Sequence, residues 1–409
     1  MPENRVLLKK CEAIDPGDVD SYVKAGGFKA LKKARDRMSP VEVIEALKAS
    51  GLRGRGGAGF PCGAKWELAR NSREKEKFLI CNADEGEVGA FKDRYVLQND
   101  PFSVIEGMAI AAYAVGAQEA YIYLRAEYHF LLEGLKRAVE QVKAKGLLKS
   151  LDIKITEGAG AYVCGEESAL MNSIEGRRGE ARCRPPYPPT RGLFEKPTII
   201  NNVETLINVP HIIAKGPEWY AKLGTEKSKG TKLFSVSGDV RQPGVYEMEL
   251  GCKLGDLLTL ARAENVKLVQ VGGASGRIVP HSMLDTRLSF ETILGSGAIT
   301  VFNESRDVID IVSRTMGFFN KESCGKCTPC REGAEVMVEI FGRLVKGDGV
   351  HEDLEILEDL SHVMMDASMC GLGQTAPIPV LDTLKYFRSE YENRIDQSAF
   401  LRRLKVISA

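Results

Sequence analysis

The chain has 409 residues, of which 44% are apolar and 27% charged, a composition typical of a globular protein large enough for two or three domains. Lys+Arg and Asp+Glu both total 56, so the basic surplus of a nucleic-acid-binding protein is absent. The most apolar stretch, residues 108–117, is too short to cross a bilayer, and we expect no direct membrane insertion. Ten cysteines without an apolar leader segment predict a reducing compartment, with thiols left single or bound to metal.

The first firmly predicted helix covers residues 40–50. Ser39 is a favourable N-cap residue, Glu42 completes a capping box with it, and Gly51 ends the helix. A glycine-dense loop, "GLRGRGGAGF" at 51–60, then leads into another predicted helix.

Strands and helices alternate after this loop. We predict strands at 77–81, 119–124 and 152–157, and helices at 101–116, 128–145 and 165–175. This alternation is typical of a parallel sheet covered by helices. The segment "RPPYPPTRG" (184–192) excludes regular structure, and a helix is predicted to resume at "NNVETLINV" (201–209).

The pattern changes near residue 228. Residues 232–251 predict two strands around a turn, followed by a short helix at 254–262 and a strand at 267–271. From about residue 311 the periodicity is almost entirely helical. We therefore expect three domains, α/β over 1–229, a small α+β module over 230–310 and an all-α region over 311–409.

Three cysteines in "SCGKCTPC" are spaced three apart, at Cys324, Cys327 and Cys330. An iron–sulfur cube takes four thiolates, and such a triplet with one remote cysteine is a common ligand set. Cys370 is the only later cysteine, and nearby glycines allow close backbone approach. These four residues predict a 4Fe–4S cluster. The alternative is a structural zinc, which usually takes two separated cysteine pairs.

The loop "GRGGAG" fits G-x-G-x-x-G, but a helix precedes it instead of the strand that the dinucleotide fingerprint requires. We therefore reject that fingerprint. The loop still offers many backbone donors at a helix N-terminus, which suits phosphates or a ring in close backbone contact. Arg55 and Lys65 add positive charge. A plain tight turn is the alternative.

Polar and glycine residues follow the first and third predicted strands: Asn82, Asp84, Glu85, Glu87, Gly158, Gly160, Tyr162, Gly165, Glu166 and Glu167. Ligands of parallel sheets bind beyond the carboxyl ends of the strands, so we expect these loops and the glycine loop to share one cleft. Asn201, Asn202 and Thr205 offer amide and hydroxyl donors to a phosphate there. There are simpler interpretations: Asn202 caps the helix that follows it, and Glu166 and Glu167 complement the dipole of the helix after Gly165.

With the glycine loop, "CNADEGE", "GAGAYVCGEE", "INNVET" and "ESCGKCTPC" in this order, the chain resembles, over essentially its whole length, the flavin-carrying, NADH-binding (F-type) flavoprotein of bacterial NADH:quinone oxidoreductase, complex I. The resemblance implies a Rossmann-like FMN domain with a parallel sheet, a ubiquitin-like (SLBB, β-grasp) domain and a C-terminal helical bundle with a 4Fe–4S cluster. It implies oxidation of NADH by hydride transfer to FMN, then single-electron transfer to the cluster and on towards quinone through partner proteins.

The FMN-binding residues that the resemblance implies are Gly54, Arg55, Gly56, Gly57, Lys65, Asn82, Asp84, Gly86, Glu87, Tyr162, Gly165, Glu166, Glu167, Asn201, Asn202, Val203 and Thr205. The implied NADH site contains Phe60, Glu87, Arg184 and Tyr187, with Arg184 where lysine is frequent and Tyr187 where phenylalanine is frequent. Glu87 is the residue expected to act in catalysis: its carboxylate would limit product retention by repelling anionic groups or ordering water. No protein acid or base is required.

The implied partners are a thioredoxin-like 2Fe–2S protein and the larger iron–sulfur protein of complex I, at the cytoplasmic side of the inner membrane and peripheral to it. The nearest alternative is the diaphorase component of an NAD-reducing hydrogenase or NAD-dependent formate dehydrogenase. Those chains often carry extra thioredoxin-like or ferredoxin domains, so the extent of this chain favours complex I. A non-enzymatic iron–sulfur relay and a zinc-stabilised binding module are more distant alternatives.

Overall fold

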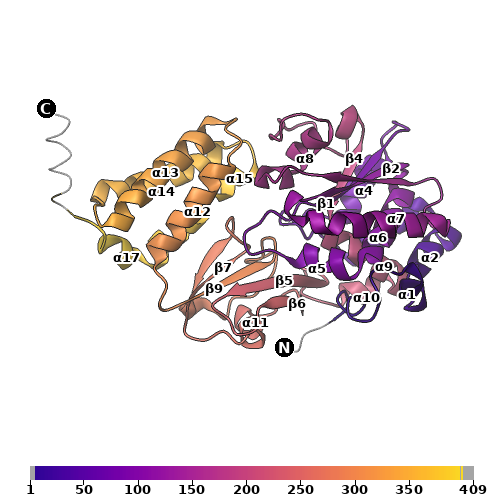
Figure 1. Ribbon diagram of the computed structural model, residues 1–409, viewed down its shortest axis with the longest axis horizontal. Helices are drawn as coiled ribbons and strands as arrows, with labels where there is room; N and C mark the ends of the chain where they lie inside the picture. The colour runs from indigo at the N-terminus through magenta and orange to yellow at the C-terminus, as the bar shows by residue number, and fades with distance from the viewer. Residues whose placement is uncertain (1–4, 397, 399–409) are drawn as a thin grey trace.

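The computed structural model describes residues 5–396 and residue 398. Three regions follow one another along the chain: a parallel sheet with its helices, a mixed sheet, and a group of helices (Figure 1). In Figure 1 the mixed sheet lies between the other two regions at the lower edge of the molecule, and α8 and α15 approach each other at the upper edge.

The first region contains a four-stranded parallel sheet in the order β3-β2-β1-β4. The strands β1 (Phe78–Ala83), β2 (Glu119–Leu124) and β3 (Asp152–Glu157) confirm the three predicted strands. The fourth strand, β4 (Thr198–Asn202), is not predicted from the sequence. The helix predicted to begin at residue 201 begins instead at Val203, because Asn201 and Asn202 pair with β1 at the end of β4.

The helices of this region are α1 (Val19–Lys24), α2 (Lys29–Arg37), α3 (Pro40–Ser50), α4 (Cys62–Arg70), α5 (Lys92–Asn99), α6 (Pro101–Val115), α7 (Leu132–Ala144), α8 (Glu167–Ile174), α9 (Val203–Lys215) and α10 (Pro217–Ala221). Short 3₁₀ turns lie at η1 (Ala126–Leu131), η2 (Tyr162–Gly165) and η3 (Leu193–Glu195). The capping box predicted at the start of α3 is present. The predicted helix at 128–145 is divided into the 3₁₀ turn η1 and the helix α7, and the helix predicted at 165–175 is α8, which begins at Glu167 after the turn η2.

Both faces of the parallel sheet are buried at its strands β1 and β2. Leu79 and Cys81 pack into a core shared with α6 and α9, while Phe78 and Ile80 on the opposite face of β1 join a second apolar cluster. This second cluster continues into the C-terminal helices, so the sheet and the helical region share one core. A side chain at Gly107 of α6 would lie 2.3 Å from the Leu206 carbonyl oxygen of α9, so these two helices require a glycine at their crossing.

The mixed sheet has the order β6-β5-β9-β7-β8, with its own apolar core. Its strands are β5 (Thr231–Gly238), β6 (Gly244–Glu249), β7 (Val266–Val271), β8 (Arg277–Pro280) and β9 (Ala298–Asn303), joined by α11 (Leu254–Leu260) and η4 (His281–Met283). β5 and β9 are parallel, and the other neighbours are antiparallel. The hairpin and the strand at 267–271 are confirmed, whereas β8 and β9 are not predicted from the sequence.

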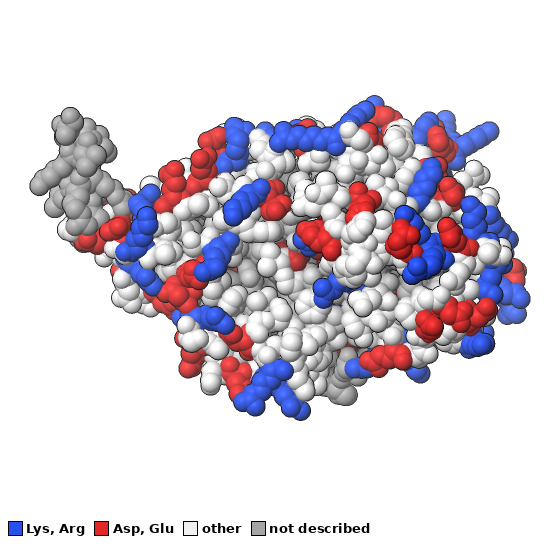
Figure 2. Space-filling view, in the orientation of Figure 1, with Lys and Arg blue, Asp and Glu red and all other residues white. Residues whose placement is uncertain are grey.

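The C-terminal region is helical, as predicted, with α12 (Val308–Glu322), α13 (Thr328–Lys346), α14 (His351–Ala367), α15 (Gly371–Thr375), α16 (Ile378–Tyr386) and α17 (Arg388–Glu392). Within the described residues no helix combines the length and apolar character that crossing a membrane requires. The face drawn in Figure 2 carries interspersed charges of both signs, in keeping with the equal totals of 56 acidic and 56 basic residues.

Candidate functional site

The glycine loop is closed at its base and open at its tip. The Gly54 N–H donates to the Phe60 carbonyl oxygen at 2.9 Å, and the Cys62 N–H donates to the Leu52 carbonyl oxygen at 2.9 Å. Gly57 has a φ of 129°, and a side chain there would meet no atom within 4 Å. The loop therefore presents bare backbone to open space, which a flat or phosphorylated ligand can approach closely.

The loops at the carboxyl ends of β1 and β4 lie beside this glycine loop. A side chain at Gly56 would lie 3.1 Å from the Asn202 Cβ. The Asn82 Nδ2 donates to the Gly165 carbonyl oxygen at 3.0 Å, which holds the turn before α8 against the end of β1. The structure thus places the glycine loop at the end of β4 and the turn before α8 at the end of β1, and the region that these loops border is referred to below as the cleft.

Asp84 is an unsatisfied acceptor in this cleft. Its Oδ2 is buried without a hydrogen-bond partner among the described residues, and a side chain at Gly165 would lie 3.7 Å from that oxygen. Burial raises the pKa of Asp84 to about 7, against the opposing attraction of Arg125. An unpaired buried carboxylate oxygen is costly, so this position suits a ligand that brings a hydrogen-bond donor.

Asp84→Asn is therefore expected to change how stability depends on pH in the cofactor-free protein. The folded pKa lies above the ordinary value of 3.8, so the contribution of Asp84 is fully present below that value and is lost as pH rises through about 7. In urea unfolding, the free energy of unfolding of the variant should exceed that of the wild type. This difference should grow from about 1 to about 4 kcal/mol between pH 5 and 8. Asp36→Asn, at an exposed position on α2, is the control. If the difference in unfolding free energy between the variant and the wild type stayed the same across this pH range, the raised pKa of Asp84 would be contradicted.

Charged side chains line the cleft near the start of α8. Glu166 caps that helix by accepting from the Ser168 and Ala169 N–H groups, and its other oxygen pairs with Arg184. The Lys65 Nζ lies 3.0 Å from Glu167 and 2.9 Å from the Ile200 carbonyl oxygen. These charges are matched, so an anionic ligand would compete with Glu166 and Glu167 for the basic groups.

Two large aromatic side chains stand exposed near this cleft. Phe60, at the end of the glycine loop, is 52% exposed and Tyr187, in the proline-rich segment, is 57% exposed. Exposed rings of this size are suited to stacking on a planar ligand. A hollow of about 190 Å³ beside the segment of Tyr187 is lined by Arg184 and Cys183, among others.

Several predicted ligand residues are instead used by the protein itself. Arg55 is 1% exposed, and its guanidinium donates to the Thr231 and Lys229 carbonyl oxygens and to the Tyr220 hydroxyl. Its charge therefore lies inside the protein, whereas the sequence pattern predicts it beside a ligand. The Thr205 hydroxyl accepts from the Arg55 N–H at 2.8 Å.

Asn201 and Val203 also face the interior. The Asn201 Oδ1 accepts from the Trp66 Nε1–H at 2.8 Å, and Val203 is fully buried. These residues fix the loops that border the cleft; their side chains do not open into it.

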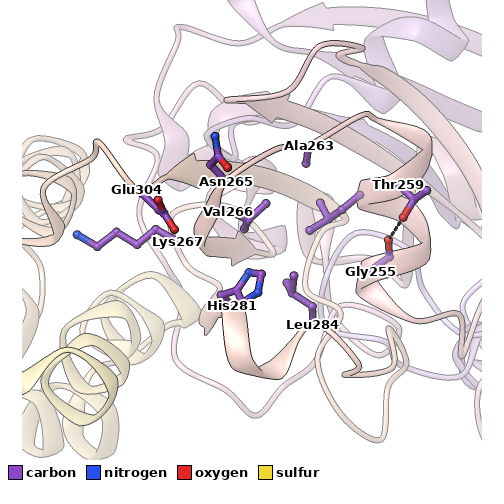
Figure 3. A pocket seen from close by; sticks show the side chains of 10 residues that line it. Gly255, Thr259, Ala263, Asn265, Val266, Lys267, His281, Leu284 and Glu304 are labelled. Carbon is purple, nitrogen blue, oxygen red and sulfur yellow. Dashed lines mark hydrogen bonds between the residues drawn. The ribbon is translucent and has the colours of Figure 1, made fainter.

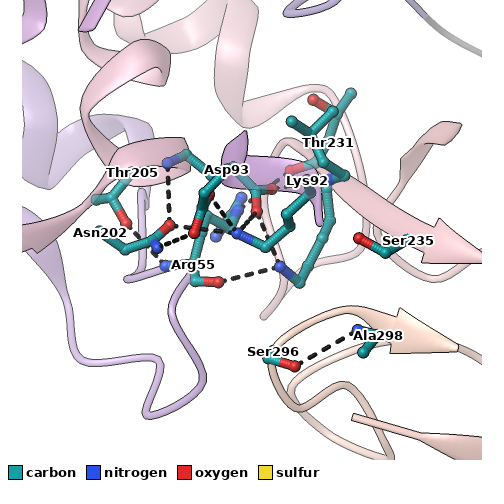
Figure 4. Close-up of polar contacts among 12 residues, drawn as sticks. Arg55, Lys92, Asp93, Asn202, Thr205, Thr231, Ser235, Ser296 and Ala298 are labelled. Atoms are coloured by element: carbon teal, nitrogen blue, oxygen red, sulfur yellow. Dashed lines mark hydrogen bonds and ion pairs between the residues drawn. The ribbon is translucent and has the colours of Figure 1, made fainter. Parts of the chain in front are cut away.

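A buried ionic network lies beneath the glycine loop, and no sequence signal predicts it (Figure 4). The Lys92 Nζ lies 2.7 Å from Asp93 and 2.9 Å from Glu204. The Lys232 Nζ on β5 lies 3.0 Å from the same Glu204 oxygen. Burial acts to raise the pKa of Glu204, but Lys232 and Lys92 outweigh it and lower that pKa. Burial lowers the pKa of Lys232 to about 8.

This network holds two parts of the cleft in place. Asp93 accepts from the Asn202 Nδ2 at 2.6 Å, and Lys232 donates to the Arg55 carbonyl oxygen at 3.1 Å. The contacts are drawn in Figure 4 around Asn202 and Arg55. The network therefore connects the mixed sheet, through Lys232, to the glycine loop and to the end of β4.

All three regions meet at Tyr162. Its hydroxyl donates to Glu87 at 3.0 Å, and its N–H donates to Glu322 at the end of α12 at 3.0 Å. Ser275 of the mixed-sheet region also donates to Glu87, at 2.6 Å. Burial raises the pKa of Glu87, against the bonds from Ser275 and Tyr162. The Tyr162 ring packs edge-on against Phe318, with ring centres 5.1 Å apart.

The four predicted cysteine ligands lie together, just beyond Glu322. Cys324 and Cys327 lie in the loop after α12, Cys330 lies in the first turn of α13, and Cys370 precedes α15. Burial raises the pKa of the Cys330 thiol, and the neighbouring Cys327 and Cys370 raise it further. All four thiols are free and adjoin one apolar cluster.

This donor set fits a cube of iron and sulfide. Within the described part of the chain, no three Cys, His, Asp or Glu side chains lie close enough together to hold a single metal ion. Thiolates bound to a cube each meet a different iron, so they surround the cluster without converging. Burial raises the pKa of the Cys370 thiol, and the backbone N–H groups of Leu372 and Gly373 act in the opposite direction.

A separate hollow of about 660 Å³ lies on the mixed-sheet region (Figure 3). His281, Val266 and Leu284 line it, and in Figure 3 the His281 ring and Leu284 lie below Val266. None of the predicted site residues lines it.

Comparison with known proteins identifies both halves of the site. Residues 47–211 match the family described as the Nuo51 FMN-binding domain, and residues 310–394 match the NADH-ubiquinone oxidoreductase-F iron-sulfur binding region. The first segment contains the glycine loop and the cleft, and the second contains all four cysteines. The chain therefore carries an FMN-binding domain and a 4Fe–4S binding region.

Relatives match over nearly the whole chain. NADP-reducing hydrogenase subunit HndC of Solidesulfovibrio fructosivorans is 42% identical over 96% of this chain and 84% of its own length. An F-type NADH-quinone oxidoreductase flavoprotein of Rhizobium meliloti is 40% identical over 96% of this chain and 98% of its own. A crystal structure of an NAD+-reducing [NiFe]-hydrogenase in the H2-reduced state superposes with a TM-score of 0.90 at 41% identity, covering 97% of this chain and 67% of that one.

Proposed function

Because the chain belongs to the F-type flavoprotein family of NADH-quinone oxidoreductases, we propose that it oxidises NADH at a bound FMN and delivers the electrons to its own 4Fe–4S cluster. The observation that carries this proposal is the junction at Tyr162, where the cleft meets α12, the helix that ends two residues before Cys324. A flavin accepts two electrons from a nicotinamide and releases them one at a time, as an iron–sulfur cluster requires.

The chain's own residues have binding and orienting roles in this proposal. The open backbone at Gly57, the Asn82 amide and the unpaired Asp84 oxygen would hold the flavin, while Lys65 supplies charge near the cleft. Phe60, Arg184 and Tyr187 would bind the nicotinamide nucleotide. Other proposed flavin contacts, such as Arg55 and Thr205, would act by fixing the loop and not by touching the ligand.

Glu87 would act at the boundary between the flavin and the nucleotide. Ser275 and Tyr162 donate to one of its oxygens, and the Ser275 N–H donates to the other at 3.3 Å. Burial raises the pKa of Glu87, and these bonds, which orient the carboxylate, act in the opposite direction. A fixed negative charge there would repel anionic groups of the product.

Addition of NADH to the purified FMN-containing chain under anaerobic conditions tests this function directly. We expect the yellow flavin absorbance to bleach within the time of mixing, in proportion to the NADH added. A flavin that stays oxidised with NADH, yet bleaches with dithionite, would contradict the proposal and favour a non-enzymatic iron–sulfur relay.

Phe60→Ala is expected to weaken nucleotide binding without releasing FMN. The ring is 52% exposed and contributes little to the core, so its loss should act on the ligand and not on the fold. With ferricyanide as acceptor, KM for NADH should rise about tenfold, as loss of roughly one stacked ring predicts, while kcat changes less. Phe130→Ala, at a 62% exposed ring on η1, should leave KM unchanged. Equal KM values for the wild type and the Phe60 variant would contradict this role.

More specifically, we propose that the chain is the component of respiratory complex I at which electrons enter. It would lie at the cytoplasmic side of the membrane, peripheral to it. Its partners would be the thioredoxin-like 2Fe–2S protein and the larger iron–sulfur protein. The chain would have domain boundaries at 229/230 and 310/311 and a ubiquitin-like β-grasp domain of the SLBB type in the middle, in keeping with a mixed sheet over 231–303. The full-length coverage of an F-type relative supports this reading.

The diaphorase component of an NAD-reducing hydrogenase is the second candidate, because hydrogenase chains match at similar identity. Purification of the native complex from its source, with metal and activity analysis, distinguishes the two. NADH-dependent quinone reduction without nickel supports complex I, whereas nickel and hydrogen-dependent NAD+ reduction support the hydrogenase.

A further inference from the structure

Ser368 is a buried hydroxyl that the fold leaves without a partner. The residue follows the last turn of α14 and is 5% exposed. Its Oγ has no hydrogen-bond partner among the described residues, although its carbonyl oxygen accepts from the Gln374 side chain at 2.9 Å. Buried hydroxyls in proteins are almost always bonded, so this one calls for an acceptor that the chain alone does not supply.

The hydroxyl lies against Cys330, the most deeply buried of the four cysteines. A side chain at Gly373 would lie 2.5 Å from the Ser368 Oγ and 2.9 Å from the Cys330 Cβ. Ser368, Gly373 and Cys330 are therefore packed together, and only a glycine fits between them. The unpartnered hydroxyl thus lies among the proposed cluster ligands.

A second hydroxyl approaches Cys330 from the end of α12. The Ser323 Oγ lies 3.4 Å from the Cys330 Sγ and accepts from the Gly325 N–H at 3.2 Å. Because its oxygen is already an acceptor, its own hydrogen is available to the cysteine sulfur. Two hydroxyls, from the ends of two different helices, therefore flank the same cysteine.

We propose that Ser368 donates a hydrogen bond to a sulfur of the 4Fe–4S cluster beside Cys330, that Ser323 donates to the Cys330 thiolate, and that both bonds raise the reduction potential of the cluster. Reduction adds negative charge to the cluster, and a donor to its sulfurs stabilises that charge. Both serines are positioning residues that act through the cluster. The proposal rests on the proposed ligation by the four cysteines.

The direct test is a redox titration of the purified protein with its cofactors, followed by the EPR signal of the reduced cluster. Ser368→Ala is expected to shift the midpoint potential to more negative values with unchanged iron and sulfide content. Ser323→Ala should shift it in the same direction. Ser361→Ala is the matched control, because Ser361 is also buried on α14 but its hydroxyl donates to the Leu357 carbonyl oxygen at 2.6 Å.

A conservative variant separates the hydroxyl from the packing. Ser368→Thr keeps the donor and is expected to restore the wild-type potential. The proposal is overturned by an unshifted potential in Ser368→Ala with full iron content, by a lowered potential in Ser368→Thr equal to that of Ser368→Ala, or by loss of iron from a folded Ser368→Ala chain. Failure of the ligand assignment itself has a different signature: Cys370→Ser would then retain its iron.

Discussion

Replacing Cys370 by serine is expected to remove the 4Fe–4S cluster and to leave FMN bound. A cube needs four thiolates, and the sulfur of Cys370 is the one supplied from outside the Cys324–Cys330 loop. The cleft residues belong to the parallel-sheet region, so the flavin site does not depend on Cys370 directly. Iron should fall from about four atoms per chain towards zero, with loss of the EPR signal of the reduced cluster.

The flavin chemistry should survive this change. NADH oxidation with ferricyanide, which accepts electrons without the cluster, is expected to remain largely intact. Cys183→Ser is the control, because Cys183 is exposed and lies outside the helical region. That variant should keep all of its iron. If Cys370→Ser kept its iron and its EPR signal, the assignment of the fourth ligand would be wrong.

Glu204→Gln is expected to produce the largest loss of stability. Glu204 is fully buried, and its carboxylate meets Lys92 at 2.9 Å and Lys232 at 3.0 Å. The isosteric amide keeps the shape but leaves two buried ammonium groups with less compensation. Removal of one partner from a buried ion network costs about 3–5 kcal/mol. Chemical unfolding of the FMN-free protein at pH 7 measures this difference.

The pH dependence of this effect follows from the lowered pKa of Glu204. A carboxyl group whose folded pKa lies below its unfolded pKa contributes stability above the unfolded value, and loses it as pH falls through the folded value. The difference between the wild type and Glu204→Gln should therefore be largest near neutral pH and smaller in acid. Glu133→Gln, at an exposed pair with Lys136 on α7, should leave stability unchanged. Equal unfolding midpoints for the wild type and Glu204→Gln would show that the network adds no stability.

FMN affinity should fall in the same Glu204 variant, because the network holds the Asn202 side chain through Asp93 and the Arg55 carbonyl through Lys232. Quenching of FMN fluorescence on binding measures this affinity. Such a result would show that the mixed sheet and the flavin cleft are energetically linked, because Glu204→Gln would lower the affinity for a ligand that Glu204 does not contact.

The sequence predicts the strands whose burial is continuous and whose ends are marked by glycine and polar residues. β1 and β2 are of this kind, whereas β3, at the edge of the sheet, is fully buried only at Ile153; each of the three strands is six residues long. β4 has five residues and passes directly into α9, so Asn202 ends the strand and caps the helix at once. β8 has only four residues and is recognised only through its pairing with β7.

The cleft is predictable for a related reason. Glycine and short polar residues at strand ends can be recognised in the sequence, and a parallel sheet brings those strand ends to one edge. Lys92, Glu204 and Lys232 lie on α5, α9 and β5. From the sequence alone, each of them resembles an ordinary charged residue at the surface. Only the packing of these three elements buries them together. The position of the Ser368 hydroxyl beside Gly373 and Cys330 likewise results from the fold and cannot be predicted from the sequence.

The central claim is that electrons from NADH pass from the flavin cleft to the cluster within this one chain, and simultaneous optical and EPR measurement after anaerobic addition of NADH tests it most directly. We predict bleaching of the flavin together with the EPR signal of a reduced 4Fe–4S cluster, and bleaching alone in Cys370→Ser. A wild-type chain whose flavin bleaches with NADH while its cluster stays oxidised, although dithionite reduces that cluster, would contradict the account.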